Sequence, residues 1–186
     1  EIDALGGMLG IVTDNTMIQF RMLNRSKGPA MWSPRAQSDK QAFSIFWRSL
    51  LENQENLDMR QDIDTDLLIE NDYISGVITQ QGLTVLAKKV ILTNGTFLNG
   101  KIHIGEINFD GGRMGEQNSP FLSDKLKNLG IETKKLKTGT PVRIDGRTID
   151  FSKMEEQKGD ENPTGFSFTQ TPKVQNQCSC WITYTN

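Results

Sequence analysis

The chain has 186 residues, of which 35% are hydrophobic and 24% are charged. This length and composition suit one folded domain, or one domain with part of a second, and they exclude a disordered chain. With 21 basic and 23 acidic residues, the formal net charge of −2 argues against a strongly basic protein that coats nucleic acid, but it is compatible with a local basic face.

The first segment, residues 1–10, is expected to be the end of a helix. Residues 17–23 alternate as a strand does. Ser33 followed by Pro34 has the form of a helix N-cap with proline at the first helical position. Behind this pair, apolar residues recur at helical spacing, at Phe43, Phe46, Trp47, Leu50 and Leu51. The sequence therefore predicts a helix over 34–53.

Several short stretches with strand character follow this helix. They cover 57–61, 66–70, 73–79, 83–87 and 90–93. Asn71 and Asp72 form a turn between two of them, and Gln81 and Gly82 form another. The stretch 90–93 is nearly continuously apolar, as expected of a strand buried on both faces, and it ends at a glycine turn.

A glycine-rich loop at 111–115 leads to a second capped helix. Ser119 precedes Pro120, which predicts a helix over 120–129, and Gly130 stands at the position where helices commonly end. The remaining expectations are a basic strand over 131–137, an irregular polar segment over 153–163 and a last strand over 181–185.

The longest apolar runs have only four or five residues, so we expect no membrane span. No secretory leader is visible, and because the chain opens on Glu1 we expect its true beginning to lie upstream. Cys178 and Cys180 form a C-x-C pair that is too close for an ordinary disulfide, and the chain has no second pair to complete a zinc site. Reduced thiols are therefore expected, with no role assigned to either cysteine.

A meander of strands followed by a buried strand that ends in a glycine turn is typical of two-dinucleotide flavoproteins. In that arrangement the meander crosses one face of a parallel sheet, and the glycine lets the backbone approach the cofactor. An α/β sheet with a hairpin insertion gives the same pattern. The order of elements by itself leaves both interpretations open.

Five longer strings are more specific, and they occur in one order. They cover 19–30, 35–37, 92–105, 111–113 and 136–151, and they include Lys27-Gly28-Pro29, Gly95-Thr96-Phe97 and Lys137-Thr138-Gly139-Thr140-Pro141. Together they closely resemble the glucose-inhibited division protein A family. Members of that family are the large subunit of a complex that builds carboxymethylaminomethyl groups on the wobble uridine of tRNA.

The resemblance implies an α/β fold with a partial two-dinucleotide, Rossmann-like FAD-binding domain over 1–140. The family's G-x-G-x-x-G phosphate loop is expected upstream of Glu1, and residues 141–186 are expected to begin an inserted α/β domain. The implied cofactors are FAD and NADH, with methylene-tetrahydrofolate as the carbon source. The implied partners are tRNA, a GTPase subunit and a second copy of the full-length subunit, in the cytoplasm and away from membranes.

The same resemblance implies FAD contacts at seven positions, which are Asp64, Gly95, Thr96, Ser119, Thr138, Gly139 and Thr140. Asp64 would contact FAD through its backbone. For Asp64 the identity of the side chain gives no support, because the backbone makes the contact. The alternative for Ser119 is an ordinary helix cap, and for 95–96 and 138–140 it is an ordinary turn. No catalytic residue and no metal ligand is assigned. Cys180 matches a family cysteine other than those usually given catalytic roles.

Five basic residues near this region are candidates for an RNA-facing surface, namely Lys134, Lys135, Lys137, Arg143 and Arg147. The alternative is that they are solvated strand residues. On a strand, Lys135 would face away from the other two lysines. Two competing functions stay open at this point, a flavin oxidoreductase that acts on a small molecule and an inert scaffold or binding fragment. The chain alone is expected to be inactive and to bind FAD weakly or not at all.

Overall fold

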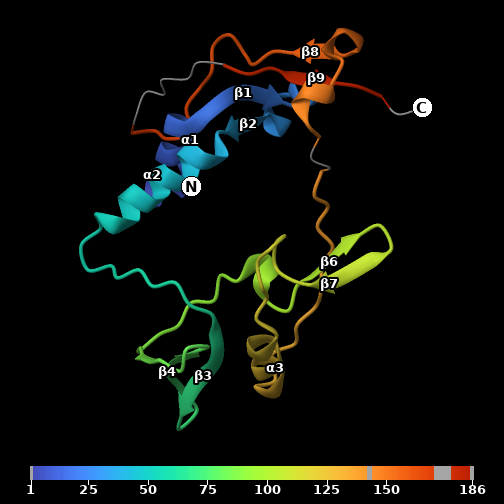
Figure 1. The fold of residues 1–186 in the computed structure, drawn as a ribbon. Helices are drawn as coiled ribbons and strands as arrows, with labels where there is room; N and C mark the ends of the chain where they lie inside the picture. Colours follow the sequence, from blue (N-terminus) through green and yellow to red (C-terminus); the bar gives the residue numbers. More distant parts are fainter. Residues whose placement is uncertain (1, 142–143, 170–176, 185–186) are drawn as a thin grey trace. The chain divides into compact units, whose positions relative to one another are not determined.

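The computed structural model, drawn in Figure 1, describes residues 2–141, 144–169 and 177–184. The chain divides into two compact units, one formed by Glu1–Met59 with Pro141–Asn186 and the other by Arg60–Thr140. Helices alternate with small antiparallel sheets in the described residues, and this mixed architecture confirms the α/β class. The assignment of 1–140 to an FAD-binding domain and of 141–186 to an inserted domain stays a prediction.

The first unit is built around one strand. Its helices are α1 (Leu9–Thr16) and α2 (Lys40–Glu52), its strands are β1 (Met17–Leu23), β2 (Ser33–Ser38), β8 (Glu155–Gln157) and β9 (Cys180–Ile182), and its short 3-10 helices are Asp3–Leu5, Arg25–Lys27, Pro29–Met31, Gly146–Thr148 and Phe151–Lys153. β1 pairs antiparallel with β2, and β8 pairs antiparallel with β9. Figure 1 shows β8 and β9 beside β1. The amide of Asp160 donates to the Phe20 carbonyl at 2.9 Å, which ties the late segment to β1.

The core of this unit lies on β1 and α1. Phe20 is 1% exposed, and its ring packs edge-on against Phe166 with the centroids 6.0 Å apart. The buried Asp14 carboxylate accepts the Phe166 amide at 2.8 Å and the Ser167 amide at 2.9 Å. Residues more than 150 positions apart in the chain are therefore held together by a charge-assisted clamp.

The second unit contains the predicted meander. Its strands are β3 (Asp64–Glu70), β4 (Tyr73–Thr79), β5 (Thr84–Leu86), β6 (Lys101–Ile104) and β7 (Ile107–Asp110), with the 3-10 helix Gly95–Phe97 and helix α3 (Pro120–Asn128). β3, β4 and β5 form one antiparallel sheet in chain order. Asn71 and Asp72 have φ values of 50° and 65°. Two successive positive φ angles are the geometry of a tight hairpin turn, so the predicted turn is confirmed.

α3 packs on β3 and forms the core of the second unit. Leu67 of β3 and Leu122 and Leu126 of α3 are buried together. Beside this apolar contact, the Lys125 ammonium lies 3.0 Å from the Asp66 carboxylate. One face of α3 is thus held to the sheet by both burial and an ion pair.

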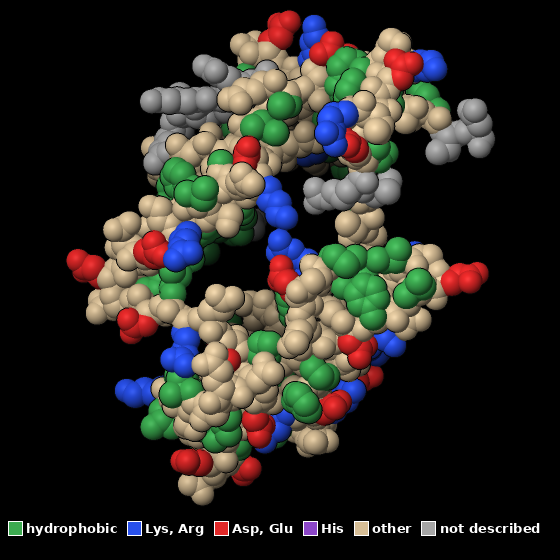
Figure 2. Space-filling model, viewed as in Figure 1, with side chains coloured by type: hydrophobic (Ala, Val, Ile, Leu, Met, Phe, Trp, Pro, Cys, Tyr) green, Lys and Arg blue, Asp and Glu red, His purple; other side chains and the backbone are tan. Residues whose placement is uncertain are grey.

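The hairpin of β6 and β7 has one apolar face and one polar face. Ile102 pairs with Phe109 and Ile104 pairs with Ile107, so these four side chains share a face. Ile104, Ile107 and Phe109 are 52%, 70% and 39% exposed. Figure 2 shows hydrophobic side chains gathered at this hairpin. Its apolar face is therefore open to solvent in this structure.

The predicted helix over 34–53 is wrong in its first part. Residues 33–38 form β2, in which Pro34 pairs with Met22. α2 begins only at Lys40, and its cap is Asp39, whose carboxylate accepts the Gln41 and Ala42 amides at 2.8 and 2.9 Å. The Ser33-Pro34 signal fails because pairing with β1 holds these residues extended.

Three predicted strands do not form in the described residues, and they are 57–61, 90–93 and 131–137. A strand depends on a neighbouring strand to accept its backbone hydrogen bonds, and these stretches pair with no described segment. Ile91 is 85% exposed rather than buried. Val90 instead packs half-buried against the Leu67 cluster.

Smaller differences occur at the two ends of the chain. Residues 1–10 contain a 3-10 helix and the start of α1, rather than the end of one helix. The last strand begins at Cys180 and ends at Ile182, so it starts one residue earlier and is shorter than the predicted strand over 181–185. Residue 185 lies outside the described residues. β8 lies within the segment 153–163 that was expected to be irregular. None of the described helices is long and apolar enough to cross a membrane.

The clamp at Asp14 predicts a large loss of stability in Asp14→Ala. This change leaves two buried amides without an acceptor, so we expect the first unit to lose about 2–4 kcal/mol. The three tryptophans, at positions 32, 47 and 181, all lie in the first unit, so urea unfolding followed by tryptophan fluorescence reports on that unit alone. Asp150→Ala, at an exposed carboxylate, is the control, and we expect it to lose much less stability than Asp14→Ala. Equal losses in the two variants would contradict the clamp.

The Asp66–Lys125 pair predicts a pH dependence of the second unit. The hydrogen bond from Lys125 holds the pKa of Asp66 below its ordinary value of 3.8. A lowered pKa contributes stability above 3.8 that is lost as the pH falls through the folded-state value. Because both side chains are partly exposed, we expect Asp66→Asn to cost only about 0.2–1 kcal/mol at neutral pH and nothing in acid.

Far-UV circular dichroism during denaturant unfolding, at neutral pH and at a pH well below 3.8, measures this difference. Asp124→Asn is the matched control, because Asp124 pairs with Lys127 within α3 alone. A loss in Asp66→Asn that persists undiminished in acid would refute the role of this ion pair.

Candidate functional site

Two of the predicted cofactor positions meet at Ser119. This residue is 8% exposed, and its Oγ donates to the Asp64 carbonyl at 2.7 Å. Its amide donates to the Phe97 carbonyl at 2.8 Å. Phe97 ends the 3-10 helix that begins with Gly95 and Thr96. The structure therefore brings Asp64, Ser119 and the turn after the predicted strand 90–93 to one place, which we call the Ser119 junction.

Ser119 starts α3 but does not cap it through its side chain. The residue stands at the N-cap position, with Pro120 next to it, and its hydroxyl makes no hydrogen bond to the first turn. The ordinary cap interpretation is therefore wrong for the hydroxyl. The hydroxyl instead donates its hydrogen bond to the carbonyl of Asp64, the first residue of β3, which lies 55 positions earlier in the chain.

A pocket of about 290 Å³ opens beside the Ser119 junction. Its polar lining consists of Thr65, Gln80, Asp110, Gln117, Asn118 and Ser119. The side chain of Asn118 is fixed, because its Nδ2 donates to the Gly100 carbonyl at 2.7 Å. A larger hollow of about 560 Å³ adjoins this pocket, with Thr65 and Phe121 lining both, and contains the Asp66–Lys125 pair. The smaller pocket is the better candidate, because only it reaches the predicted cofactor residues.

The lining of the smaller pocket fits one part of FAD better than another. Amide and hydroxyl groups with one carboxylate can bond to the hydroxyls of a ribose and to the edge of an adenine ring. No lysine or arginine stands among the described lining residues, so this pocket lacks the charge that a diphosphate needs. Its volume is at the lower limit for small-molecule sites. The residues present therefore fit the adenosine end of FAD.

Gly95 and Thr96 are both exposed. Gly95 has a φ of +55°, and no atom of the described chain lies within 4 Å of where its Cβ would be. The glycine is thus required by backbone conformation rather than by a close neighbour.

Gly100 and Gly112, which the sequence analysis did not single out, show the opposite behaviour. A Cβ on Gly100 would collide with the Thr96 carbonyl and stand 2.7 Å from the Gly111 carbonyl, and one on Gly112 would collide with the Phe97 ring. The segments around Gly100 and Gly112 therefore pass close to the turn at 95–97. In the sequence, only the strings 92–105 and 111–113, which contain these glycines, indicated this close approach.

The string from Thr138 to Thr140 is not brought to the junction. All three residues are exposed and without regular structure. Among the described residues, no hydrogen bond connects them to Asp64, Gly95 or Ser119. Their assignment to the cofactor stays a prediction.

The assignment of the basic candidates to an RNA-facing surface stays a prediction, but one detail of it changes. Residues 131–137 are not a strand, so the expected alternation between Lys134 and Lys135 is wrong. Lys134 lies 3.6 Å from the carboxylate of Glu132. Arg143 lies outside the described residues.

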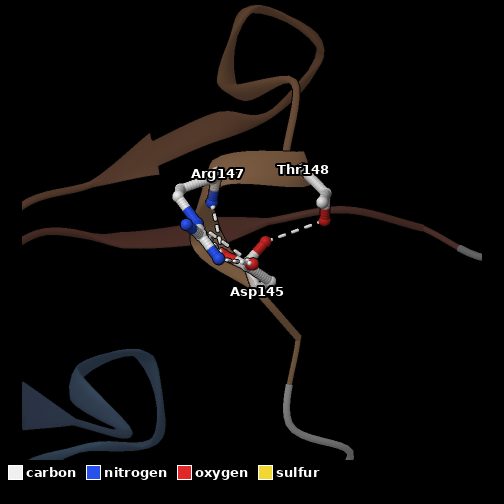
Figure 3. A network of polar contacts seen from close by, with 3 residues as sticks. All are labelled: Asp145, Arg147 and Thr148. Carbon is white, nitrogen blue, oxygen red and sulfur yellow. Dashed lines mark hydrogen bonds and ion pairs between the residues drawn. The ribbon is translucent and has the colours of Figure 1, made fainter.

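Arg147 is engaged with its own neighbour, as Figure 3 shows. Its Nε donates to Asp145 Oδ1 at 3.0 Å and its Nη2 to Oδ2 at 2.6 Å. The Thr148 hydroxyl donates to the Asp145 carbonyl at 2.7 Å. The bidentate contact lowers the pKa of Asp145 and raises the pKa of Arg147, so both groups stay charged and neutralise each other. The pair is exposed to solvent, so the assignment of Arg147 to an RNA-facing surface stays a prediction.

Cys180 belongs to a partly buried polar cluster in the first unit. Its Sγ donates to Gln19 Oε1 at 3.2 Å, and Arg35 Nη2 donates to the same oxygen at 3.2 Å. Gln19 is 1% exposed, and its Nε2 donates to the carbonyls of Gln157 and Cys178. Gln19 thus connects β1, β2, β8 and β9, and Cys180 serves this packing.

Comparison with known proteins gives one consistent result. The sequence model of the family described as glucose inhibited division protein A matches residues 1–186. A protein of Cytophaga hutchinsonii named tRNA uridine 5-carboxymethylaminomethyl modification enzyme MnmG is 54% identical over 187 aligned residues. The protein of the same name from Flavobacterium johnsoniae is also 54% identical. Both matches cover all of this chain and 30% of the relative, so the chain spans less than a third of their length.

The solved structures agree with the sequence relatives. The structure of Aquifex aeolicus GidA in its form I crystal is 45% identical and has a TM-score of 0.89, covering 97% of this chain and 31% of that one. The form II crystal gives a TM-score of 0.88 with the same coverage. With the family match over its whole length, the chain belongs to the glucose inhibited division protein A family.

Proposed function

We propose that this chain is a segment of a flavin-dependent enzyme that modifies the wobble uridine of tRNA, and that it supplies part of the FAD site. Two observations support the proposal, the family membership and the activity for which relatives at 54% identity are named. Their substrate is a tRNA uridine, which favours an RNA-modifying enzyme over a flavoenzyme that acts on a small molecule.

The observation that carries the FAD assignment is the Ser119 junction with its adjoining pocket. The hydroxyl of Ser119 fixes the Asp64 carbonyl, and the fixed Asn118 amide stands beside it. A binding site gains affinity when its polar groups are already in place before the ligand arrives. Here the chain itself orders the pocket, because each of these groups is held by a hydrogen bond within the second unit.

FAD supplies the redox chemistry of such an enzyme, while the protein binds and orients the cofactor. In the proposed enzyme, the polar lining of the pocket would hold the adenosine end, and the Asp110 carboxylate would accept a hydrogen bond from a ribose hydroxyl. Gly95 and Thr96 border the cofactor, and the 138–140 string crosses near it. None of these residues takes or gives the hydride.

The rest of the activity is proposed from the family alone. NADH would reduce the flavin, methylene-tetrahydrofolate would give the carbon, and a GTPase subunit would act with a homodimer of the full-length subunit. We place this enzyme in the cytoplasm, where tRNA is modified.

A substitution that fills the pocket tests the FAD site directly. Gln117→Trp puts a large side chain at an exposed position of the pocket lining without removing an internal hydrogen bond. A suitable host is a chimaera in which this chain replaces the matching segment of the Cytophaga hutchinsonii relative. We expect its flavin content to fall at least about tenfold, because loss of the buried contacts costs at least about 1.4 kcal/mol.

Asn128→Trp is the matched control, because Asn128 lines the other hollow on the same helix. Its flavin content should equal that of the parent chimaera, as read from the ratio of flavin to protein absorbance. If Gln117→Trp retains full flavin while both variants stay folded, the pocket does not hold FAD.

A second test separates backbone conformation from cofactor contact at Gly95. Asparagine tolerates positive φ better than other side chains, so Gly95→Asn should fold with a loss of less than about 1 kcal/mol. The added side chain would still enter the space that FAD borders. We therefore expect Gly95→Asn in the chimaera to lose most of its flavin while its thermal unfolding midpoint changes little. A variant that keeps its flavin would reduce Gly95 to a turn residue.

A further inference from the structure

The connection between β1 and β2 is a rigid corner, which we define as residues 24–32. Asn24 and Gly28 have φ values of 60° and 91°, so the chain reverses through two left-handed positions. The Lys27 amide donates to the Asn24 carbonyl at 2.9 Å, and the Met31 amide donates to the Gly28 carbonyl at 3.0 Å. Asparagine adopts positive φ readily, so the rigidity of the corner depends on restraint from another segment.

Asp160, from the far end of the chain, supplies that restraint. Its Oδ2 accepts the Met22 amide at 2.9 Å and Arg25 Nη2 at 2.7 Å. Its own amide donates to the Phe20 carbonyl at 2.9 Å. The corner is therefore fixed to β1 by contacts that span about 135 residues.

The fixed corner presents an indole ring to solvent. Trp32 is 48% exposed, and its Nε1 donates to the Arg25 carbonyl at 3.3 Å, which sets the orientation of the ring. Met31 beside it is 52% exposed. A large aromatic side chain that is held in place and left open costs stability, and this combination is common where aromatic rings receive a ligand.

The corner that carries Trp32 contains two basic residues, Arg25 and Lys27, and the acidic residue paired with it is Asp160. The Arg25 side chain keeps 62% of its surface exposed although it pairs with Asp160. Lys27 is exposed and has no ion-pair partner among the described residues. Phe168 is another exposed aromatic residue in the same unit, and its neighbour is negatively charged, because the Phe168 amide donates to the Asp3 carboxylate at 2.9 Å. Phe168 is 89% exposed against 48% for Trp32, so it serves as an open aromatic ring beside an acidic rather than a basic residue.

We propose that Trp32 is a stacking platform for an unpaired RNA base, with Lys27 and Arg25 contacting the adjacent phosphates. An open indole accepts any base on its face, and lysine and arginine bind the backbone, which is how single-stranded RNA is commonly held. This inference rests on the proposed function, because it takes its RNA from the tRNA substrate. The positive neighbours favour RNA over an apolar protein surface as the occupant.

The test uses the full chain and its Trp32→Ala, Trp32→Phe and Phe168→Ala variants. The probe is a fluorescently labelled RNA hairpin whose loop carries unpaired uridines, compared with the same RNA closed into a duplex. Loss of one stacked base should weaken hairpin affinity at least about fivefold in Trp32→Ala. Trp32→Phe keeps a ring but lacks the indole N–H, so it should stay within about twofold if stacking is the cause. Phe168→Ala should match the wild type, and duplex affinity should be unchanged in every variant.

Intrinsic fluorescence gives a second readout, because RNA should quench the wild type and this quenching should be lost in Trp32→Phe. Equal hairpin affinity of the wild type and Trp32→Ala, with circular dichroism showing both folded, overturns the platform and leaves the FAD proposal standing. A wild type that does not bind the hairpin overturns it as well. Flavin content in the chimaera, measured separately, shows whether the proposed function fails too. If Lys27→Ala lowers the affinity and flattens its salt dependence while Trp32→Ala does not, the corner binds phosphate alone.

Discussion

The arrangement of the second unit depends on one buried serine. Ser119 donates twice, from its hydroxyl to the Asp64 carbonyl and from its amide to the Phe97 carbonyl. These bonds join the start of β3, the end of the Gly95–Phe97 turn and the start of α3. Each such bond contributes only about 1 kcal/mol, but a donor or acceptor left unpaired in a buried position costs more. The pocket proposed for FAD opens where these three segments meet.

Local signals in the sequence predicted the parts of the fold that local interactions decide. The hairpin turn at Asn71 and Asp72, the meander and the helix over Pro120–Asn128 follow from turn residues, alternation and a proline at the first helical position. The helix at 34–53 failed at its start because two caps competed. Asp39 caps the helix, while Ser33 and Pro34 pair with β1. The residues around Ser33 and Pro34 do not by themselves indicate that another strand will pair with them.

The same limit applies to the unformed strand at 90–93. Its apolar run predicts burial, but burial depends on which other segments come near, and here Ile91 stays exposed while Val90 joins the Leu67 cluster. The clamp of Asp14 on Ser167 is of the same kind, since nothing near Asp14 in sequence announces a partner 153 residues away.

The candidate site could be predicted only in part. The family resemblance named Asp64 and Ser119, and the structure adds that one hydroxyl joins them. The pocket residues Gln117 and Asn118 carried no signal, because side chains of this kind are common in any polar loop. The role of the basic residues stays a prediction, and the structure adds only that Arg147 pairs with Asp145.

The central claim is that the pocket beside Ser119 receives the adenosine end of FAD, and photo-crosslinking tests it most directly. An FAD analogue with a photoreactive azido group on the adenine would be bound to the chimaera and irradiated, and the labelled peptides would be identified by mass spectrometry. We expect labels on the pocket lining, which consists of Ile63, Thr65, Gln80, Asp110 and 117–121, and we expect excess FAD to suppress them. Labels found only outside this lining, with the same suppression, would contradict the claim.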